Sequence, residues 1–558
     1  MGIDVERLYD RRADNRWDRT CVGDVLERLI WSRPDRVALT GWAGAFADPA
    51  FERMTYREAD AVVNQVANGL LAAGLQRGDR VLLLCENSVE AYLTKLGAAK
   101  AGLVSVPLNP GLAVDVVTQL IALVEPRFAV VDAEVWPQVN SAFAEQEVQV
   151  NVTIAIGGGP VAGSVSFSDF VAAQPIVEPD TVVHGDDIWE ILFTSGTTAL
   201  PKGAMLSHTY AHMGALAFAL SLTRGVAVES DLVHVAFLPV IYHVADQALS
   251  LSALLAGGRL VIGRRAVPAE MAAAIEREHA TAVWGGSPQL VKALAAAMEN
   301  EVPAGTQSSL RVVVFGWGAI EPGVRSALKR LCGVHLTLVG IFGQTEAISC
   351  HRFWPDVWAE KFQAAGSSVN YVGIPNPLLA STVMDVDGRQ LLDQPGVPGE
   401  AVYRSPAVTA GYYRDRPATE EAFRYGWFHS GDSCVVDEEG LRIMVDRYKD
   451  IIKSGGENVS SLRVEAILHE HPEVLKAAVV GLDHDRWGEA VTAVVIRAPG
   501  ASVSESDLIA WCRSRLAGFE TPKAVLFTDA LPETVGGKVL KYKLRQSMAD
   551  LYTVAASG

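Results

Sequence analysis

Short β-branched runs alternate with helical patterns over much of the chain, and this order constrains the fold more than any other feature. Helical patterns occur at 56–73 and 89–101, and β-branched runs at 80–84, 103–107 and 127–131. Gly-containing turns separate them, which is typical of β-α-β units. Five later runs follow the same rhythm: 187–193, 259–262, 281–284, 311–315 and 335–341. The sequence therefore predicts an α/β fold that holds its ligands in loops at strand ends.

After residue 385 the pattern changes to short strands joined by hairpin-like turns. The turns read DVDG at 385–388, QPGVPGE at 394–400 and VDEEG at 436–440. We expect a large N-terminal domain over 1–446, built of α/β subdomains and a small β-rich subdomain at about 385–446. Residues 447–558 are expected to form a small α+β C-terminal domain of ordinary domain size.

Composition places the chain among ordinary globular proteins and limits its partners. Its 558 residues suggest about three or four structural units. With 48 Lys and Arg against 65 Asp and Glu, the formal charge of −17 argues against a general attraction to nucleic acid. The six cysteines form no C-x-x-C pair, the N-terminus has no apolar leader, and no uninterrupted apolar run reaches about 18 residues. We therefore expect a cytoplasmic protein with no transmembrane segment. The sequence does not determine the oligomeric state, and a homodimer is one of the states that stay open.

One loop is rich in hydroxyl groups. The segment 193–203, with the sequence FTSGTTALPKG, follows a predicted strand and precedes a helical pattern. Its four hydroxyl donors, Gly backbone and single Lys suit a triphosphate, because hydroxyls and amides bond the oxygens while Lys202 offsets their charge. It is not a Walker A loop, since G-x-x-x-x-G-K-[ST] is absent. Taken alone, the segment is equally compatible with a flexible surface loop.

The same segment closely resembles the T-S-G-T-T-G-x-P-K-G signature of the adenylate-forming superfamily. That superfamily includes acyl-CoA synthetases, peptide-synthetase adenylation domains and beetle luciferases. Further matches follow in the family's order: FGQTE at 342–346, SGD at 430–432, DRYKD at 446–450, and Pro532 with Gly537-Lys538. Weaker likeness extends the resemblance to nearly the whole chain. Ala199 departs from the pattern, because the family usually has Gly there.

The resemblance implies two half-reactions. A carboxylate attacks the α-phosphate of ATP to give acyl-AMP and pyrophosphate, and the thiol of coenzyme A (CoA) then displaces AMP. Joining two anions needs charge neutralisation and alignment more than a covalent nucleophile. By resemblance, Lys202 and the loop hydroxyls would hold the β- and γ-phosphates, Glu346 would ligate Mg²⁺, and Lys538 would bridge the substrate carboxylate and the α-phosphate. Without these neighbours, Lys538 reads as a solvated Lys after a turn.

The resemblance also implies a nucleotide-binding set. Asp432 would accept hydrogen bonds from both ribose hydroxyls, and Arg447 would add a donor there or at the phosphate. Phe342 would stack on adenine, although an aromatic residue after a buried strand is more often part of the core. The full set is Thr194, Ser195, Gly196, Thr197, Thr198, Lys202, Gly318, Ala319, Phe342, Gly343, Gln344, Thr345, Asp432 and Arg447.

Lys449 falls at the family's hinge position, which implies two working orientations of a mobile C-terminal domain. One orientation would present Lys538 for adenylation. The other would bring the CoA-binding residues to a tunnel for the pantetheine arm of CoA, where glycines let a narrow group pass close to the backbone. These residues are Lys453, Ser454, Gly455 and Gly456.

Two residues are candidates for the acyl pocket. His243 matches the family's Pro-x-x-His pattern with one extra residue, and an interior structural His is the alternative. Trp317 stands where many relatives have Gly, so it either shortens or turns the pocket, or it points into the core and braces the strand at 311–315. The pair His208 and His212 has the i,i+4 spacing of metal ligands, but no third ligand accompanies it, so no zinc site is expected.

These features favour an AMP-forming acyl-CoA synthetase similar to fatty-acid-CoA ligases. Its substrates would be a small-molecule carboxylic acid, ATP with Mg²⁺, and CoA. Because about 20 residues follow Lys538, too few for a carrier domain, a stand-alone ligase is expected. The alternatives are an acyl-AMP ligase that feeds a carrier protein and a non-catalytic nucleotide-binding scaffold. Fatty, aryl and polycyclic acids all stay open.

Overall fold

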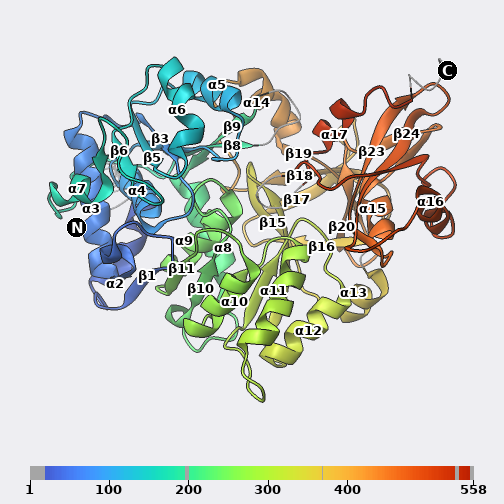
Figure 1. Ribbon diagram of the computed structural model, residues 1–558, viewed down its shortest axis with the longest axis horizontal. Coiled ribbons are helices and arrows are strands. Elements are labelled where there is room, and N and C mark those ends of the chain that lie inside the picture. The colour runs from blue at the N-terminus through green and yellow to red at the C-terminus, as the bar shows by residue number, and fades with distance from the viewer. Residues whose placement is uncertain (1–18, 195–199, 367–368, 534–538, 553–558) are drawn as a thin grey trace, which may run out of the picture.

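The computed structural model describes residues 19–194, 200–366, 369–533 and 539–552, and it confirms the α/β architecture. Three sheets organise these residues (Figure 1). Two large sheets with their helices form the N-terminal part, coloured from blue to yellow in Figure 1. A smaller sheet, in orange and red, lies at the C-terminal end of the chain beside them.

The seven-stranded sheet is formed by the early β-α-β units. Its strands lie in the order β7 (Val165–Ser166), β6 (Val152–Ile154), β5 (Phe128–Asp132), β3 (Arg80–Leu84), β4 (Val104–Pro107), β8 (Ile188–Thr194) and β9 (Lys202–Ser207). Neighbours are parallel except for β8 and β9, which form a hairpin. The runs expected at 80–84, 103–107, 127–131 and 187–193 are found here within one residue at each end.

The 13-stranded sheet joins a parallel half to an antiparallel half. Its order is β17 (Ala380–Met384), β18 (Gly399–Arg404), β19 (Phe428–Val436), β20 (Arg442–Arg447), β16 (Asn370–Pro375), β15 (Ala347–Phe353), β14 (Thr337–Gln344), β13 (Val312–Phe315), β12 (Ala282–Trp284), β10 (Val233–Ala236), β11 (Arg259–Ile262), β1 (Val37–Gly41) and β2 (Arg53–Thr55). Neighbours from β1 to β14 are parallel, and those from β14 to β17 are antiparallel. The β-rich region therefore continues this sheet, and it begins before residue 385.

The parallel strands are buried on both faces, which explains their continuous apolar sequence. In β13, Val312 and Val314 belong to one hydrophobic core, while Val313 belongs to the core on the opposite face. This alternation follows from the two-residue period of a strand. The loops at the strand ends are left free to carry polar side chains.

Helices cover these sheets. They are α2 (Glu27–Ile30), α3 (Tyr56–Ala72), α4 (Val89–Lys100), α5 (Val114–Val124), α6 (Trp136–Glu145), α7 (Phe167–Ala172), α8 (His208–Leu222), α9 (Val244–Leu255), α10 (Pro268–Arg277), α11 (Pro288–Glu301), α12 (Pro322–Cys332), α13 (Ala359–Ala365), α14 (Arg416–Ala422), α15 (Ser461–His469), α16 (Glu505–Arg513) and α17 (Lys541–Ser547). α4 is buried at every position, and the Ser88 hydroxyl caps its N-terminus. Within the described part of the chain, no helix has the length and apolar character needed to span a membrane.

The C-terminal sheet has its own strands and order. These are β22 (Glu457–Val459), β21 (Ile452–Ser454), β24 (Gly488–Arg497) and β23 (Val474–His484), with β25 (Ala524–Phe527) paired to β24. The large sheet ends at Arg447 and this one starts at Ile452, so the change of sheet lies next to the predicted domain boundary. The domain limits and the mobility of the C-terminal part stay predictions.

Candidate active site

A cavity of about 1220 Å³ lies between the loops of the large sheets and the C-terminal part of the chain. It brings together motifs that lie far apart in the sequence. The predicted site residues that line it are Thr194, Lys202, His243, Trp317, Gly318, Ala319, Phe342, Gly343, Gln344, Thr345, Glu346, Asp432, Arg447 and Lys449. Ser195, Gly196, Thr197, Thr198 and Lys538 lie outside the described residues.

The predicted phosphate loop connects the two strands of the β8–β9 hairpin. Thr194 and Lys202 are cross-strand partners at the loop end of the hairpin, and the Thr194 hydroxyl donates to the Lys202 carbonyl at 3.3 Å. The Lys202 ammonium lies 5.1 Å from the ring centre of Tyr412. The hairpin thus presents one cation at the cavity wall, where a phosphate could be neutralised.

Glu346 follows β14 and is only 8% exposed. The Tyr412 hydroxyl donates to its Oε1 at 2.9 Å, and the Thr409 backbone N–H donates to its carbonyl. Burial, together with the nearby Glu346 carboxylate, raises the pKa of Tyr412, so the phenol stays protonated as a donor. None of the sequence motifs described above includes Tyr412. Its only sequence signal is a tyrosine pair in a turn at 412–413.

The Glu346 carboxylate fits Mg²⁺, which prefers oxygen ligands and usually keeps several waters. Among the described residues there is no cluster of three or more His, Cys, Asp or Glu side chains that could hold a metal by themselves. Mg²⁺ bound at Glu346 would complete its coordination with phosphate oxygens and water. That is how Mg²⁺ is usually held at nucleotide sites.

Asp432 and Arg447 form a cross-strand pair on β19 and β20. The Arg447 Nε lies 2.6 Å from Asp432 Oδ1, and the Asp432 backbone N–H donates to the Ser430 hydroxyl at 3.0 Å. The Asp432 carboxylate raises the pKa of Arg447, outweighing its burial. Asp432 is 1% exposed. The Asp432 carboxylate is thus an acceptor held beside the Arg447 cation, an arrangement that suits a ribose diol next to a phosphate.

The expected adenine site has two walls. Phe342 lies on β14 and packs near His351 of β15, with ring centres 6.2 Å apart. Gly318 and Ala319 follow β13 and line the same cavity as Phe342. The Tyr210 hydroxyl donates to the Thr345 carbonyl at 2.7 Å and so holds the turn between β14 and β15. The Phe342 ring and the backbone of Gly318 and Ala319 could thus contact a flat base.

His243, Trp317 and Trp284 form a row of rings at the expected acyl end. Ring centres are 5.4 Å apart for His243 and Trp317, and 5.3 Å apart for Trp317 and Trp284, both edge-to-face. Trp317 is 40% exposed and has a φ of 63°, the left-handed region that side chains rarely adopt. Both Trp317 and Trp284 line the cavity, and Trp284 is only 1% exposed.

The face that the C-terminal part presents to the cavity is not the face predicted to bind CoA. Glu533 and Val539, which flank residues 534–538, form an antiparallel bridge and both line the cavity. In contrast, Lys453 and Ser454 at the end of β21, and Gly455 and Gly456 in the β21–β22 turn, are not among the cavity-lining residues. Gly455 and Gly456 have φ of 64° and 88°, which explains the need for glycine there. Lys449 lines the cavity in the turn after β20.

Two family models match the chain. A model described as AMP-binding enzyme matches residues 26–413, and one described as AMP-binding enzyme C-terminal domain matches residues 463–538. The chain belongs to the AMP-binding enzyme family. Asp432, Arg447 and Lys449 lie between the two matched segments, at 26–413 and 463–538.

Relatives of this AMP-binding enzyme match nearly its whole length. Feruloyl-CoA synthase from Amycolatopsis sp is 34% identical over 509 residues, covering 88% of this chain and 94% of that protein. Long-chain-fatty-acid–CoA ligase FadD13 from Mycobacterium tuberculosis is 30% identical over 526 residues, covering 93% and 98%. The crystal structure of ATP-bound MatB from Rhodopseudomonas palustris matches with a TM-score of 0.80 at 28% identity, covering 95% and 99%. The chain therefore belongs to the acyl-CoA synthetase branch of the adenylate-forming superfamily.

Proposed function

We propose that this protein is an ATP-dependent, AMP-forming ligase that activates a carboxylic acid as acyl-AMP and transfers the acyl group to CoA. The observation that carries the proposal is one cavity lined by Lys202, Glu346 and the Asp432–Arg447 pair. A cation, a carboxylate suited to Mg²⁺ and a ribose acceptor are what the adenylation half-reaction requires. The resemblance to CoA ligases supports the thioester half-reaction.

The described residues would act mainly by position and charge. Asp432, held by Arg447 at 2.6 Å, would accept hydrogen bonds from the ribose hydroxyls. The phosphates would then extend toward Lys202 and Glu346, whose carboxylate is oriented by Tyr412. When bound at Glu346, Mg²⁺ would supply positive charge to the phosphates. Lys538 would align the substrate carboxylate with the α-phosphate.

The orientation of the C-terminal part supports an assignment to the adenylation step. Glu533 and Val539 face the cavity, and Lys538 immediately precedes Val539 in the sequence. The β21–β22 turn, which we propose binds CoA, contributes nothing to the cavity lining here. Thioester formation would then need a rotation about Lys449 that exchanges these two faces.

For the acid, we propose a compact or planar substrate. Trp317 occupies part of the cavity and packs edge-to-face against His243 and Trp284, which narrows the acyl end. The similarity to feruloyl-CoA synthase agrees with such a shape, whereas the similarity to FadD13 favours a longer chain. Straight long-chain acids are therefore expected to be the poorer substrates.

Incubation of the protein with ATP, Mg²⁺, CoA and a panel of fatty and aryl acids tests the proposal. We expect AMP, pyrophosphate and an acyl-CoA identified by mass spectrometry, and we expect Glu346→Gln to lose most of this activity. Acyl-AMP that accumulates with CoA present but is consumed by a holo-carrier protein would show the carrier-protein alternative instead. Absence of acid-dependent pyrophosphate release with every acid would refute the ligase function.

A further inference from the structure

The segment 238–243 connects β10 to α9 and forms one wall of the cavity. Pro239, Tyr242 and His243 line the cavity, whereas Leu238, Val240 and Ile241 are buried behind it. The segment has no helix or strand of its own, so its polar backbone groups need partners from elsewhere. Three of its backbone groups are held by side chains of the α4 region.

Asn87, which lies just before α4, makes the central contacts. Its Nδ2 donates to the carbonyl oxygens of Leu238 at 2.8 Å and Gly263 at 3.0 Å, and its Oδ1 accepts from the Val240 N–H at 2.8 Å. The side chain is 1% exposed. Asn87 therefore ties the cavity segment to the end of β11, from a position that follows β3 of the other large sheet.

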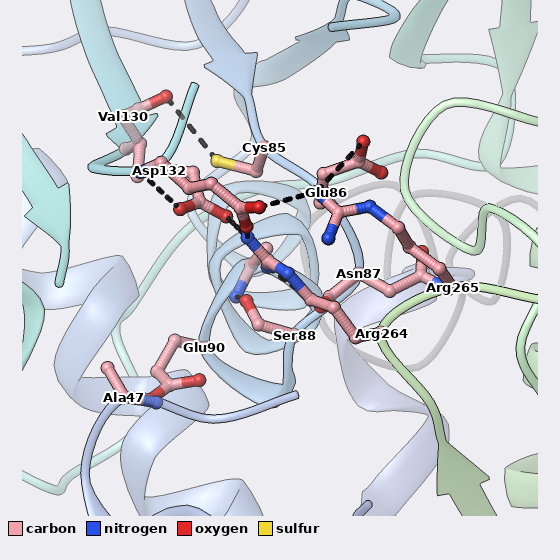
Figure 2. A network of polar contacts seen from close by, with 12 residues as sticks. Ala47, Cys85, Glu86, Asn87, Ser88, Glu90, Val130, Asp132, Arg264 and Arg265 are labelled. Carbon is pink, nitrogen blue, oxygen red and sulfur yellow. Dashed lines mark hydrogen bonds and ion pairs between the residues drawn. The ribbon is translucent and has the colours of Figure 1, made fainter. Parts of the chain in front are cut away.

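The backbone of Asn87 is itself fixed (Figure 2). Arg264 donates to the Asn87 carbonyl at 3.1 Å and pairs with Asp132 and Glu134 at 2.6 Å each. Arg265 pairs with Glu134 at 2.8 Å. These ion pairs link the end of β5 to the loop after β11. The connection between the two sheets is therefore rigid where Asn87 meets the cavity segment.

Lys95, on α4, holds the next part of the segment. Its Nζ donates to the Ile241 carbonyl at 2.7 Å and pairs with Glu190 of β8 at 2.6 Å. Gln247 donates to the same carbonyl at 3.1 Å. Lys95 and Glu190 are both buried, a costly arrangement that is tolerated only when both partners are satisfied. The Ile241 carbonyl that Lys95 holds immediately precedes Tyr242 and His243 in the sequence.

We propose that Asn87 and Lys95 are positioning residues, which hold the segment 238–243 and thereby fix Tyr242 and His243 against the bound acid. Neither side chain lines the cavity, so each would act only through the segment. Tyr242 has one further tether, because its hydroxyl donates to Glu86 at 3.2 Å, and Glu86 precedes Asn87. The inference rests on the proposed function, since it concerns the acid-binding end of that site.

The first test replaces Asn87 by Leu, which removes its four side-chain hydrogen bonds, to Leu238, Val240, Gly263 and, at 3.4 Å, Phe237, at similar volume. Asn64→Leu is the matched control, because Asn64 is also buried and its side chain is also hydrogen-bonded, to Asp60, Lys100 and Ile176, none of which lines the cavity. Pyrophosphate exchange is measured with the best acid of the panel. The KM for the acid and the KM for ATP are compared in each variant.

We expect Asn87→Leu to raise the KM for the acid by about tenfold or more, because small displacements of binding groups have large effects. The KM for ATP should change less than about twofold, and Asn64→Leu should change neither KM even if its melting temperature falls. An unchanged acid KM in Asn87→Leu, or equal increases in both KM values, would overturn the inference. No exchange by the wild type with any acid would instead overturn the proposed function and the inference together.

A second variant covers the case in which Asn87→Leu does not fold. The paired replacement Lys95→Met with Glu190→Leu substitutes apolar side chains for a buried ion pair, which is often tolerated or stabilising. It leaves Asn87 in place and removes the Lys95 bond to the Ile241 carbonyl, which leaves the longer Gln247 bond at 3.1 Å to hold this carbonyl. A selective rise in the acid KM supports the inference, and wild-type KM values for both substrates in this folded variant contradict it.

Discussion

At the scale of single residues, the hydrogen bond from Tyr412 to Glu346 orients the carboxylate that we propose for Mg²⁺. Tyr412→Phe removes this bond and keeps the ring beside Lys202. Hydrogen bonds to charged groups contribute about 1.5–3 kcal/mol, so we expect kcat/KM for pyrophosphate exchange to fall roughly 10- to 150-fold. Tyr413→Phe is the neighbouring control. Equal activity of the two variants would show that the bond does not matter for the reaction.

We propose that Trp317 limits the length of the acid that the cavity accepts. Trp317→Gly removes the indole, and Gly accepts the left-handed backbone at this position without strain. We expect kcat/KM for longer acids to rise relative to short ones by about 10- to 200-fold. The measurement is a length series of acids in both proteins. A uniform loss at every length would indicate that Trp317 only braces the strand β13.

The residues that could be predicted from the sequence are those in contiguous motifs. Lys202, Glu346, Asp432 and Arg447 lie in such motifs, and all of them line one cavity. Tyr412 and Asn87 could not be predicted, because their roles depend on contacts with residues far away in the sequence. A lone Tyr or Asn outside a motif carries no signal of such a contact.

At the scale of elements, strand β10 carries a fully buried histidine, His234, among apolar residues. Burial lowers the pKa of His234 to about 3, against about 6.5 in an unfolded chain. Below about pH 6.5 the unfolded chain binds a proton that the folded protein does not, so this residue lowers the free energy of unfolding by up to about 1.4 kcal/mol per pH unit as the pH falls toward 3.

His234→Leu removes this contribution at a position that is already fully buried. We therefore expect the melting temperature of the variant to fall less than that of the wild type between about pH 7.5 and 5.0. Thermal melts across that range measure the difference. Parallel pH profiles would mean that His234 does not differ in protonation between the folded and unfolded states.

The sequence predicts the strands of the parallel sheets well, because burial on both faces imposes short apolar runs with sharp ends. β3 and β11 have the expected limits without change. The antiparallel region was predicted less well. Its first strands, β16 and β17, lie before residue 385, and β16 pairs with β20, which follows much later in the chain, a connection that no local pattern encodes.

At the scale of the whole molecule, the two proposed half-reactions require the C-terminal part to rotate about Lys449. Lys449→Pro would restrict the backbone at the turn after β20, because proline fixes φ near −65°. We expect adenylation to be largely retained and thioester formation to be slowed. Single-turnover measurements of the two half-reactions distinguish them. Equal slowing of both steps would place the hinge elsewhere.

The central claim is that one cavity supports adenylation with Lys538, while the thioester step uses another face of the C-terminal part. The most direct measurement compares the two half-reactions in Lys538→Ala: pyrophosphate exchange with the cognate acid, and CoA-dependent consumption of supplied acyl-AMP. We predict that exchange falls about 10²- to 10³-fold, the usual effect of losing one transition-state contact, while consumption of acyl-AMP stays close to the wild-type rate. An equal loss in both half-reactions would contradict the account.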